Sequence, residues 1–182
     1  MSEAQTMGNP QTLQNGMRMS IENFMSEYKR ETKPLRVPHS YSLIAKGHRL
    51  APGGKVELKL NPHSDGVSID WIGSLEFGKG QGTAALTWLC DLADRHDVTL
   101  TLKVKGSKTS DGILRLINRM DNERLLAPNG LRAWYRNHGF KDVRRKRVET
   151  TVRKSEKKYE DFTYYDVYMS RAPQRQTKRG ER

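Results

Sequence analysis

The chain has 182 residues, 35% of them hydrophobic and 30% charged, and its formal net charge is +12. This length fits one domain with a core of its own, and there is no run of about 18 apolar residues that would predict a membrane-spanning helix. The polar start MSEAQTMGNPQ does not look like an export signal. With only one cysteine, Cys90, we expect a cytoplasmic protein in which that thiol is a buried packing residue.

The first third of the chain predicts one helix and an extended segment. Residues 1–15 have almost nothing to bury and are predicted to be disordered. Apolar residues then recur at helical spacing and predict a helix over 17–30. Pro34 and Pro38 end it and begin an extended segment, with strand-like content over 41–44.

The rest of the chain alternates between strand and helix patterns. Strict apolar–polar alternation predicts strands, and apolar residues three or four apart predict helices. Lys105 to Pro128 is a long insertion in this order, and 172–182 is a basic tail predicted to be disordered. The predicted elements are strands over 56–60 and 67–72 joined by a turn at 61–66, a helix ending near His96, a strand over 98–104, a short helix at 113–117, and a helix after Pro128 capped by Asn129. His138-Gly139-Phe140 ends that helix and starts a strand that continues over 148–152, and a charged connection at 154–161 leads to a last strand over 162–169. Together they predict a single mixed α/β domain over 16–171, built around a central sheet.

A glycine-rich loop stands directly before the helix that ends near His96. Gly78, Gly80 and Gly82 alternate with Lys79 and Gln81. Such a turn leaves backbone N–H groups unpaired at a helix N-terminus, where the helix dipole also favours negative charge. The pattern predicts a phosphate or pyrophosphate site, with a flexible surface turn as the alternative. It matches neither the Walker loop nor the dinucleotide-binding fingerprint.

Several segments in order resemble one family. FGKGQGTAAL resembles motif A of the GNAT superfamily (Gcn5-related N-acetyltransferases), and LRAWYRNHGF resembles motif B. VTLTLKV matches the strand between them, and DFTYYDVYMSR resembles the closing strand, so that the similarity covers Val56 to Arg171. Phe77 stands where motif A has Arg or Gln, which removes one side-chain contact. The resemblance implies a GNAT-like mixed sheet of about six to seven strands flanked by about four helices.

The resemblance also implies acetyl-CoA as donor and an amine as acceptor. Backbone groups at the end of the 67–72 strand would hold the pantetheine, and Gly78 to Thr83 would hold the pyrophosphate. Tyr135 would protonate the departing thiolate; the other reading is that it packs the helix on the sheet. The cofactor-binding residues expected are Leu75, Phe77, Gly78, Lys79, Gly80, Gln81, Gly82 and Thr83.

Acyl transfer to an amine also needs a group that takes the amine's proton, because a lysine-like amine has a pKa of about 10.4. Asp70 is the first candidate because it lies in a strand just before the loop, although a solvated strand residue is the simpler reading. Glu76, His39 and His63 are further candidates. Trp71 and Trp88 are expected in the core or a cleft wall. The scattered histidines and isolated cysteine predict no metal site.

Three functional hypotheses follow. The first is an acetyl-CoA-dependent N-acetyltransferase that acts through a direct ternary complex. The second is a nucleic-acid-binding module, because 14 Lys or Arg against seven Asp or Glu lie between Lys141 and the C-terminus. The third is an inactive GNAT-like fold that binds a partner. Small amines, peptide N-termini, protein lysines and aminoacyl-tRNA all fit as acceptors. The basic C-terminal region favours an acidic or nucleic-acid-linked one, and dimers are common in the family.

Overall fold

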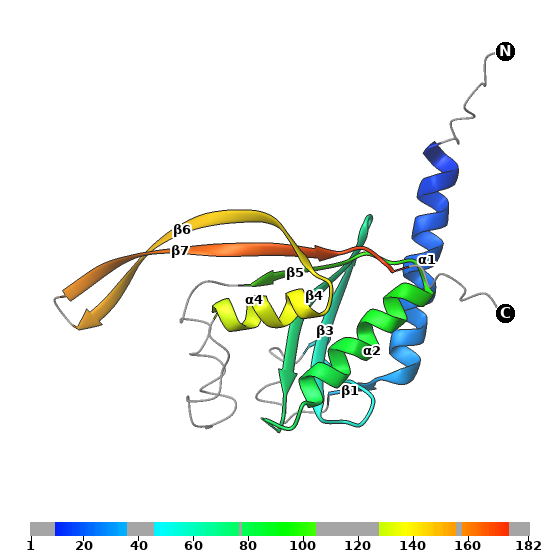
Figure 1. Ribbon diagram of the computed structural model, residues 1–182, viewed down its shortest axis with the longest axis horizontal. Coiled ribbons are helices and arrows are strands. Elements are labelled where there is room, and N and C mark those ends of the chain that lie inside the picture. The colour runs from blue at the N-terminus through cyan, green and yellow to red at the C-terminus, as the bar shows by residue number, and fades with distance from the viewer. Residues whose placement is uncertain (1–9, 36–45, 77, 105–127, 156–157, 175–182) are drawn as a thin grey trace, which may run out of the picture.

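The computed structural model describes residues 10–35, 46–76, 78–104, 128–155 and 158–174 (Figure 1). Seven strands form one sheet in the order β1-β2-β3-β4-β5-β7-β6, in which only β4 and β5 run parallel. The mixed α/β sheet that the sequence predicted is confirmed, with three helices among the described residues. The elements are α1 (Pro10–Glu31), β1 (Lys33–Pro34), β2 (Arg49–Leu50), β3 (Val56–His63), β4 (Gly66–Ser74), α2 (Gln81–Arg95), β5 (Leu100–Val104), α4 (Pro128–Asn137), β6 (Lys141–Ser155) and β7 (Lys158–Arg171).

Helices α1 and α4 both begin earlier in the chain than the sequence predicted. α1 begins at Pro10, so residues 10–15, predicted to be disordered, are helical. α4 begins at Pro128, which puts Asn129 inside the first turn rather than at the capping position. The physical reason is the same in both cases. Proline lacks the N–H that a first helical residue would leave unpaired, and its fixed φ suits that position.

Two strands continue through segments that the sequence predicted to be connections. β3 runs through Asn61 and Pro62 to His63, where it pairs with Gly66 of β4. Pro62 is tolerated because β2 pairs only with Glu57 and Leu58, so the missing N–H removes no bond to β2. The turn predicted over 61–66 is therefore confined to the two residues between β3 and β4.

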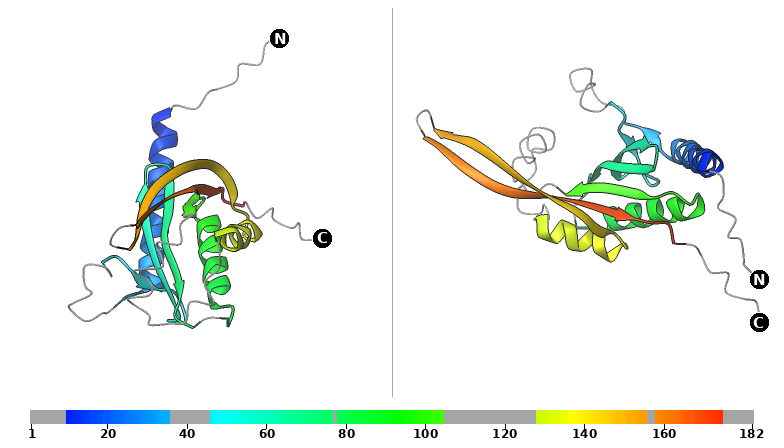
Figure 2. Two further views of the ribbon diagram at one scale, coloured as in Figure 1. Left: turned by 90° about the vertical axis from the view of Figure 1, so that its left-hand side faces the viewer. Right: turned by 90° about the horizontal axis from the view of Figure 1, so that it is seen from above.

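The β6–β7 hairpin is also longer than predicted. The pairing of β6 with β7 continues to Ser155 and Lys158, through the charged segment predicted as a connection over 154–161. Threonine, valine, tyrosine and phenylalanine are frequent on both sides of it, and these residues favour strands. β5 pairs only with residues 167–171 of β7, so the rest of the hairpin extends beyond β5 as a two-stranded ribbon (Figures 1 and 2).

Several predictions fall outside the described residues. They concern the strand-like segment at 41–44, the short helix at 113–117 and most of the long insertion. None of the described helices is long and apolar enough to cross a membrane.

The core lies between the sheet and helices α1 and α2. The apolar face predicted for α2 is buried, and so are Phe24 of α1, Leu58 of β3 and Leu100 of β5. Cys90 belongs to this core, and burial raises the pKa of its thiol to about 11, as expected for a packing residue. Figure 2 shows α2 and α4 on the same side of β5 and β7.

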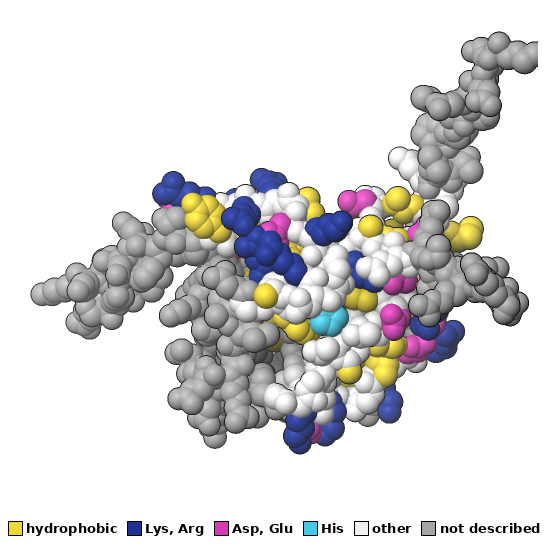
Figure 3. Space-filling view, in the orientation of Figure 1, with side chains coloured by type: hydrophobic (Ala, Val, Ile, Leu, Met, Phe, Trp, Pro, Cys, Tyr) yellow, Lys and Arg dark blue, Asp and Glu magenta, His cyan; other side chains and the backbone are white. Residues whose placement is uncertain are grey.

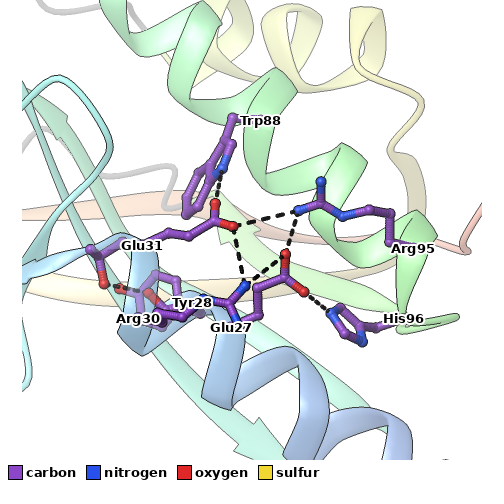
Figure 4. Close-up of polar contacts among 8 residues, drawn as sticks. Glu27, Tyr28, Arg30, Glu31, Trp88, Arg95 and His96 are labelled. Carbon is purple, nitrogen blue, oxygen red and sulfur yellow. Dashed lines mark hydrogen bonds and ion pairs between the residues drawn. The ribbon is translucent and has the colours of Figure 1, made fainter.

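A polar junction fixes α1 against the last turns of α2 (Figure 4). The Glu27 carboxylate accepts a hydrogen bond of 3.0 Å from Nη2 of Arg95, and its other oxygen lies 2.6 Å from Nε2 of His96. One turn further along α1, Glu31 accepts a bond of 2.9 Å from Nε1 of Trp88. These contacts join residues 57 to 69 positions apart in the sequence, so they orient the two helices relative to each other.

The Glu27 contacts predict a stability that depends on pH. The hydrogen bond with His96 lowers the pKa of Glu27 below its usual 4.5. A carboxyl group whose pKa is lowered in the folded state contributes stability above its unfolded pKa and loses it as pH falls through the folded pKa. We expect the free energy of unfolding of the native chain to fall more steeply below pH 4.5 than that of Glu27→Gln.

Urea unfolding at a series of pH values measures this difference. Glu22→Gln is the matched control, because Glu22 lies on the same helix but pairs with the exposed Arg18. It should leave the native pH dependence unchanged. Parallel curves for the native chain and Glu27→Gln would show that the junction does not contribute.

Candidate active site

The two parallel strands at the centre of the sheet separate after three residue pairs. β4 pairs with β5 from Val67 to Ile69, opposite Leu100 to Leu102. In the described sheet, the remainder of β4 from Trp71 to Ser74 pairs with β3 alone, and Asp70 pairs with neither strand. The backbone of this part of β4 therefore faces the opening between β4 and β5, where it can bond to an extended ligand.

A β-bulge at Asp70 marks the point of separation. Lys59 pairs with Trp71 but Leu60 pairs with Ile69, so Asp70 is the extra residue. A bulge bends its strand and increases the local twist, which turns the end of β4 away from β5. The Asp70 side chain is exposed at this bend and accepts a hydrogen bond of 2.5 Å from Oγ of Ser68.

The glycine loop opens α2 at the far end of β4. Gly80 is the N-cap residue of α2, and its φ of 70° lies in the left-handed region that favours glycine. The first helical bond runs from the N–H of Ala84 to the carbonyl of Gly80, at 3.0 Å. The N–H groups of the three residues between them have no acceptor within the helix, and no side-chain cap is found for α2 among the described residues. A Cβ built on Gly78 or Gly80 meets no atom within 4 Å, so the loop is open at these two positions.

Glu76 organises the polar side chains of this loop. Its carboxylate bonds to Nζ of Lys55, to Nζ of Lys79 at 3.3 Å and to Nε2 of Gln81 at 3.2 Å. The bond from Lys55, followed by that from Lys79, lowers the pKa of Glu76 to about 2. A carboxylate with this pKa is a weak base, which argues against the sequence hypothesis that Glu76 takes a proton from an amine.

Helix α4 packs against the start of α2 and buries Tyr135. Nε1 of Trp134 donates a hydrogen bond of 3.1 Å to Oγ1 of Thr83, one residue beyond Gly82. Tyr135 is buried where α4 contacts β5, and its ring packs against Phe140 with 5.6 Å between the centroids. Burial raises the pKa of Tyr135 above its ordinary value of 10.0, so the phenol keeps its proton at neutral pH. The structure thus brings the motif B helix and the glycine loop together.

Other candidate residues lie elsewhere. His63 is exposed at the end of β4 opposite to the glycine loop, because it pairs with Gly66 at the start of that strand. Leu75 is exposed, and its N–H donates to the carbonyl of Lys55. Trp88 packs against the core, as expected, and Trp71 is half-buried. Phe77 and His39 fall outside the described residues.

Sequence reasoning missed a histidine–glutamate pair next to Trp71. Nδ1 of His48 lies 2.5 Å from Oε1 of Glu57, and the His48 ring is 6.1 Å from the Trp71 ring. Within the described part of the chain, Nε1 of Trp71 is buried and has no acceptor. The Lys55–Glu57–Lys59 alternation showed that Glu57 lies on the polar face of β3, but only the pairing of β2 with β3 places His48 beside it. Among the described residues, no group of three or more His, Cys, Asp or Glu could hold a metal ion.

The mixed seven-stranded sheet agrees with the α/β fold that the sequence resemblance implied. No protein-family model and no curated protein matches the chain.

The structure is similar to the crystal structure of the ribosomal-protein-S18-alanine N-acetyltransferase from Escherichia coli. The identity is 14%, 100% of this chain and 97% of that chain are covered, and the TM-score is 0.48. A likeness at this level has no bearing on substrate or reaction.

Proposed function

We propose that this protein is an N-acetyltransferase that transfers an acetyl group from acetyl-CoA to a primary amine in a direct ternary complex. The observation that carries the proposal is the open glycine loop at the start of α2, beside the place where β4 and β5 separate. One end of this site suits a pyrophosphate, and the adjoining strand edge suits the amide groups of an extended pantetheine arm. Acetyl-CoA carries both groups.

The donor site is proposed over two segments. The backbone N–H groups of Gly80 to Thr83 would hold the pyrophosphate, together with Gly78 and the Lys79 side chain. Glu76 does not oppose this binding, because two lysines neutralise its charge and Lys79 remains exposed beside the loop. Leu75 and Phe77 complete the proposed cofactor-binding residues. The backbone of Asp70 to Ser74 would hold the pantetheine.

Two protons must move during the transfer, and two side chains are proposed to move them. The acceptor amine loses a proton as it attacks the thioester carbonyl, and the CoA thiolate gains one as it leaves. Asp70 is the proposed base because it is exposed at the bend where β4 leaves β5. Tyr135 is the proposed acid because it lies on α4, which contacts the start of α2 beside the glycine loop, and its buried phenol is protonated at neutral pH.

Isothermal titration of the purified chain with acetyl-CoA and with CoA tests the donor site first. We expect saturable binding of both ligands to the native chain. The loop variant Gly82→Asp should bind both ligands more weakly. Absence of heat at ligand concentrations up to about 1 mM would refute the proposal, since that limit corresponds to a binding free energy weaker than about 4 kcal/mol. Binding without turnover on any amine would identify an inactive GNAT-like fold.

Removal of either proton-transferring side chain should slow the reaction and leave donor binding intact. Once a screen of amines and peptides has identified an acceptor, we expect Tyr135→Phe and Asp70→Asn each to lower kcat by about 10²- to 10⁴-fold. The Kd for acetyl-CoA should not change, because neither side chain belongs to the proposed pyrophosphate site.

The matched controls remove a phenol hydroxyl and a carboxylate at positions outside the proposed site. Tyr165→Phe removes an exposed phenol from β7, and Asp65→Asn removes an exposed carboxylate from the turn before β4. Both should keep the native kcat. If kcat of Tyr135→Phe lies within about twofold of the native value, Tyr135 is not the acid and only packs α4 on the sheet.

A further inference from the structure

An exposed tyrosine among arginines lies on the side of the β6–β7 ribbon that faces α4. The side chains of Arg136, Arg145 and Arg147 are 51%, 58% and 62% exposed, and Tyr165 is 55% exposed. We call these four residues the basic ribbon surface. Figure 3 shows Arg and Lys side chains gathered over this part of the molecule. The proposed donor site does not include any of these residues.

The strand register gives this surface a regular spacing. Arg147 pairs directly with Tyr165, and Arg145 pairs with Val167, the next position on the same side of the ribbon. Residues two apart on a strand point the same way and lie about 7 Å from each other. Arg145 and Arg147 therefore form a short row of cations that passes beside the exposed ring of Tyr165.

Among the side chains that the structure describes, the acidic groups near Asp142 do not balance the arginines. Asp142 bonds to Arg132 and to Arg136 at 2.8 Å, and it lies 3.8 Å from Arg145, so one carboxylate faces three guanidinium groups. Glu149 pairs with Arg147 at 2.8 Å but is itself 69% exposed. Arg18 on α1 pairs with Glu22 as Arg147 does with Glu149, whereas Arg30 differs from the arginines around Asp142 because it lies near two carboxylates, those of Glu27 and Glu31.

Tyr165 is exposed although it lies in a strand of the sheet. An aromatic residue in a closing strand is expected to pack on the sheet, whereas this ring is open to solvent. An exposed aromatic face beside unbalanced guanidinium groups is the combination that binds unpaired bases and their phosphates, through stacking and ionic contacts. An acidic polypeptide would use the arginines but would leave the ring without a partner.

We propose that the basic ribbon surface binds single-stranded nucleic acid. Arg136, Arg145 and Arg147 contact successive phosphates, and Tyr165 stacks on an unpaired base. A duplex is disfavoured because its base faces are already stacked on one another. The proposal does not depend on acetyl transfer, since none of these side chains takes part in it.

Fluorescence anisotropy of the full chain with labelled oligouridylate and with oligothymidylate tests the proposal and separates RNA from DNA. Three phosphate contacts predict a slope of log K against log salt of about −2 for a single strand, and so a loss of roughly 20-fold between about 50 and 200 mM salt. The double variant Arg145→Gln/Arg147→Gln should reduce this slope by about 1.4. Tyr165→Ala should weaken binding by about 5- to 100-fold and leave the slope unchanged.

The matched control is Arg18→Gln/Arg30→Gln on α1, which removes the same net charge from exposed positions. It should bind like the native chain, and titration with acetyl-CoA should give the native Kd for every variant. If the control and the ribbon variants lose the same affinity for the oligonucleotides, binding depends only on the overall charge of the protein. That result would overturn the proposal. Tighter binding to a duplex, equal competition by polyglutamate or the absence of binding would overturn it as well.

Discussion

Gly82→Asp is expected to weaken acetyl-CoA binding by more than about 100-fold while the protein stays folded. Gly82 is the second residue of α2 and belongs to the turn whose N–H groups are proposed to hold the pyrophosphate. A carboxylate about 4 Å from a phosphate charge costs roughly 4 kcal/mol at an effective dielectric constant of about 20, and 100-fold in Kd corresponds to only about 2.7 kcal/mol.

The same substitution should not harm the helix. A Cβ built on Gly82 meets its nearest atom, Cζ2 of Trp134, at 3.8 Å, which is an ordinary contact. Replacement of a helical glycine removes backbone freedom from the unfolded chain, and a negative charge in the first turn is favourable to the dipole by about 0.3 to 1 kcal/mol. The midpoint of urea unfolding should therefore be equal to or higher than that of the native chain.

Gly82→Ala separates the two effects. It adds the same Cβ without a charge, and the space at this position accepts a Cβ. We expect native affinity by isothermal titration and a small gain in stability. If Gly82→Asp binds acetyl-CoA as well as Gly82→Ala does, the pyrophosphate lies elsewhere and the proposed donor site is wrong.

Arg171→Met is expected to lower the free energy of unfolding by about 3 to 5 kcal/mol. The Arg171 side chain is only 5% exposed, and its Nη1 and Nη2 each lie 2.7 Å from one oxygen of Asp94. Nε of Arg171 donates to the carbonyl of His138 at 3.0 Å, so this one side chain joins β7, α2 and the turn after α4. Its loss leaves the Asp94 carboxylate half-buried without its main partner.

The pKa of Asp94 shows the strength of this pairing. Burial alone would raise it, but the hydrogen bonds from Arg171 and from the N–H of Gln174 lower it below its usual 3.8. The pair therefore stabilises the fold above that pH and loses its contribution as the pH falls through the lowered value.

Urea unfolding of Arg171→Met, Asp94→Leu and the double variant tests the assignment. Each single change leaves a charge or a polar contact unpaired, whereas the double change replaces a buried ion pair with apolar side chains and is often close to neutral. We expect the double variant to recover more than half of the stability that Arg171→Met loses. Additive losses in the double variant would show that Arg171 acts mainly through its bond to His138.

The elements with a strong local pattern were predictable. Val56 and Leu58, Val67 and Ile69, and the 98–104 alternation identified three strands of the sheet, because one face of each is buried and the other is polar. The glycine loop was visible because three alternating glycines stand directly before an amphipathic helix pattern. The predicted ends of two strands were wrong, because local propensity does not determine where strand pairing stops. β3 continues through Pro62, and β6 continues through its charged end.

Composition and periodicity by themselves determined the α/β class, the order of most elements and the place of the glycine loop. Only the tertiary structure decided that Asp70 is a bulge at the separation of β4 and β5, that Glu76 is held by two lysines, and that Tyr165 is exposed among arginines. Each of these depends on residues brought together across strands or turns. Periodicity reports which face of an element is buried, but contacts between distant segments depend on register and packing, which no local pattern contains.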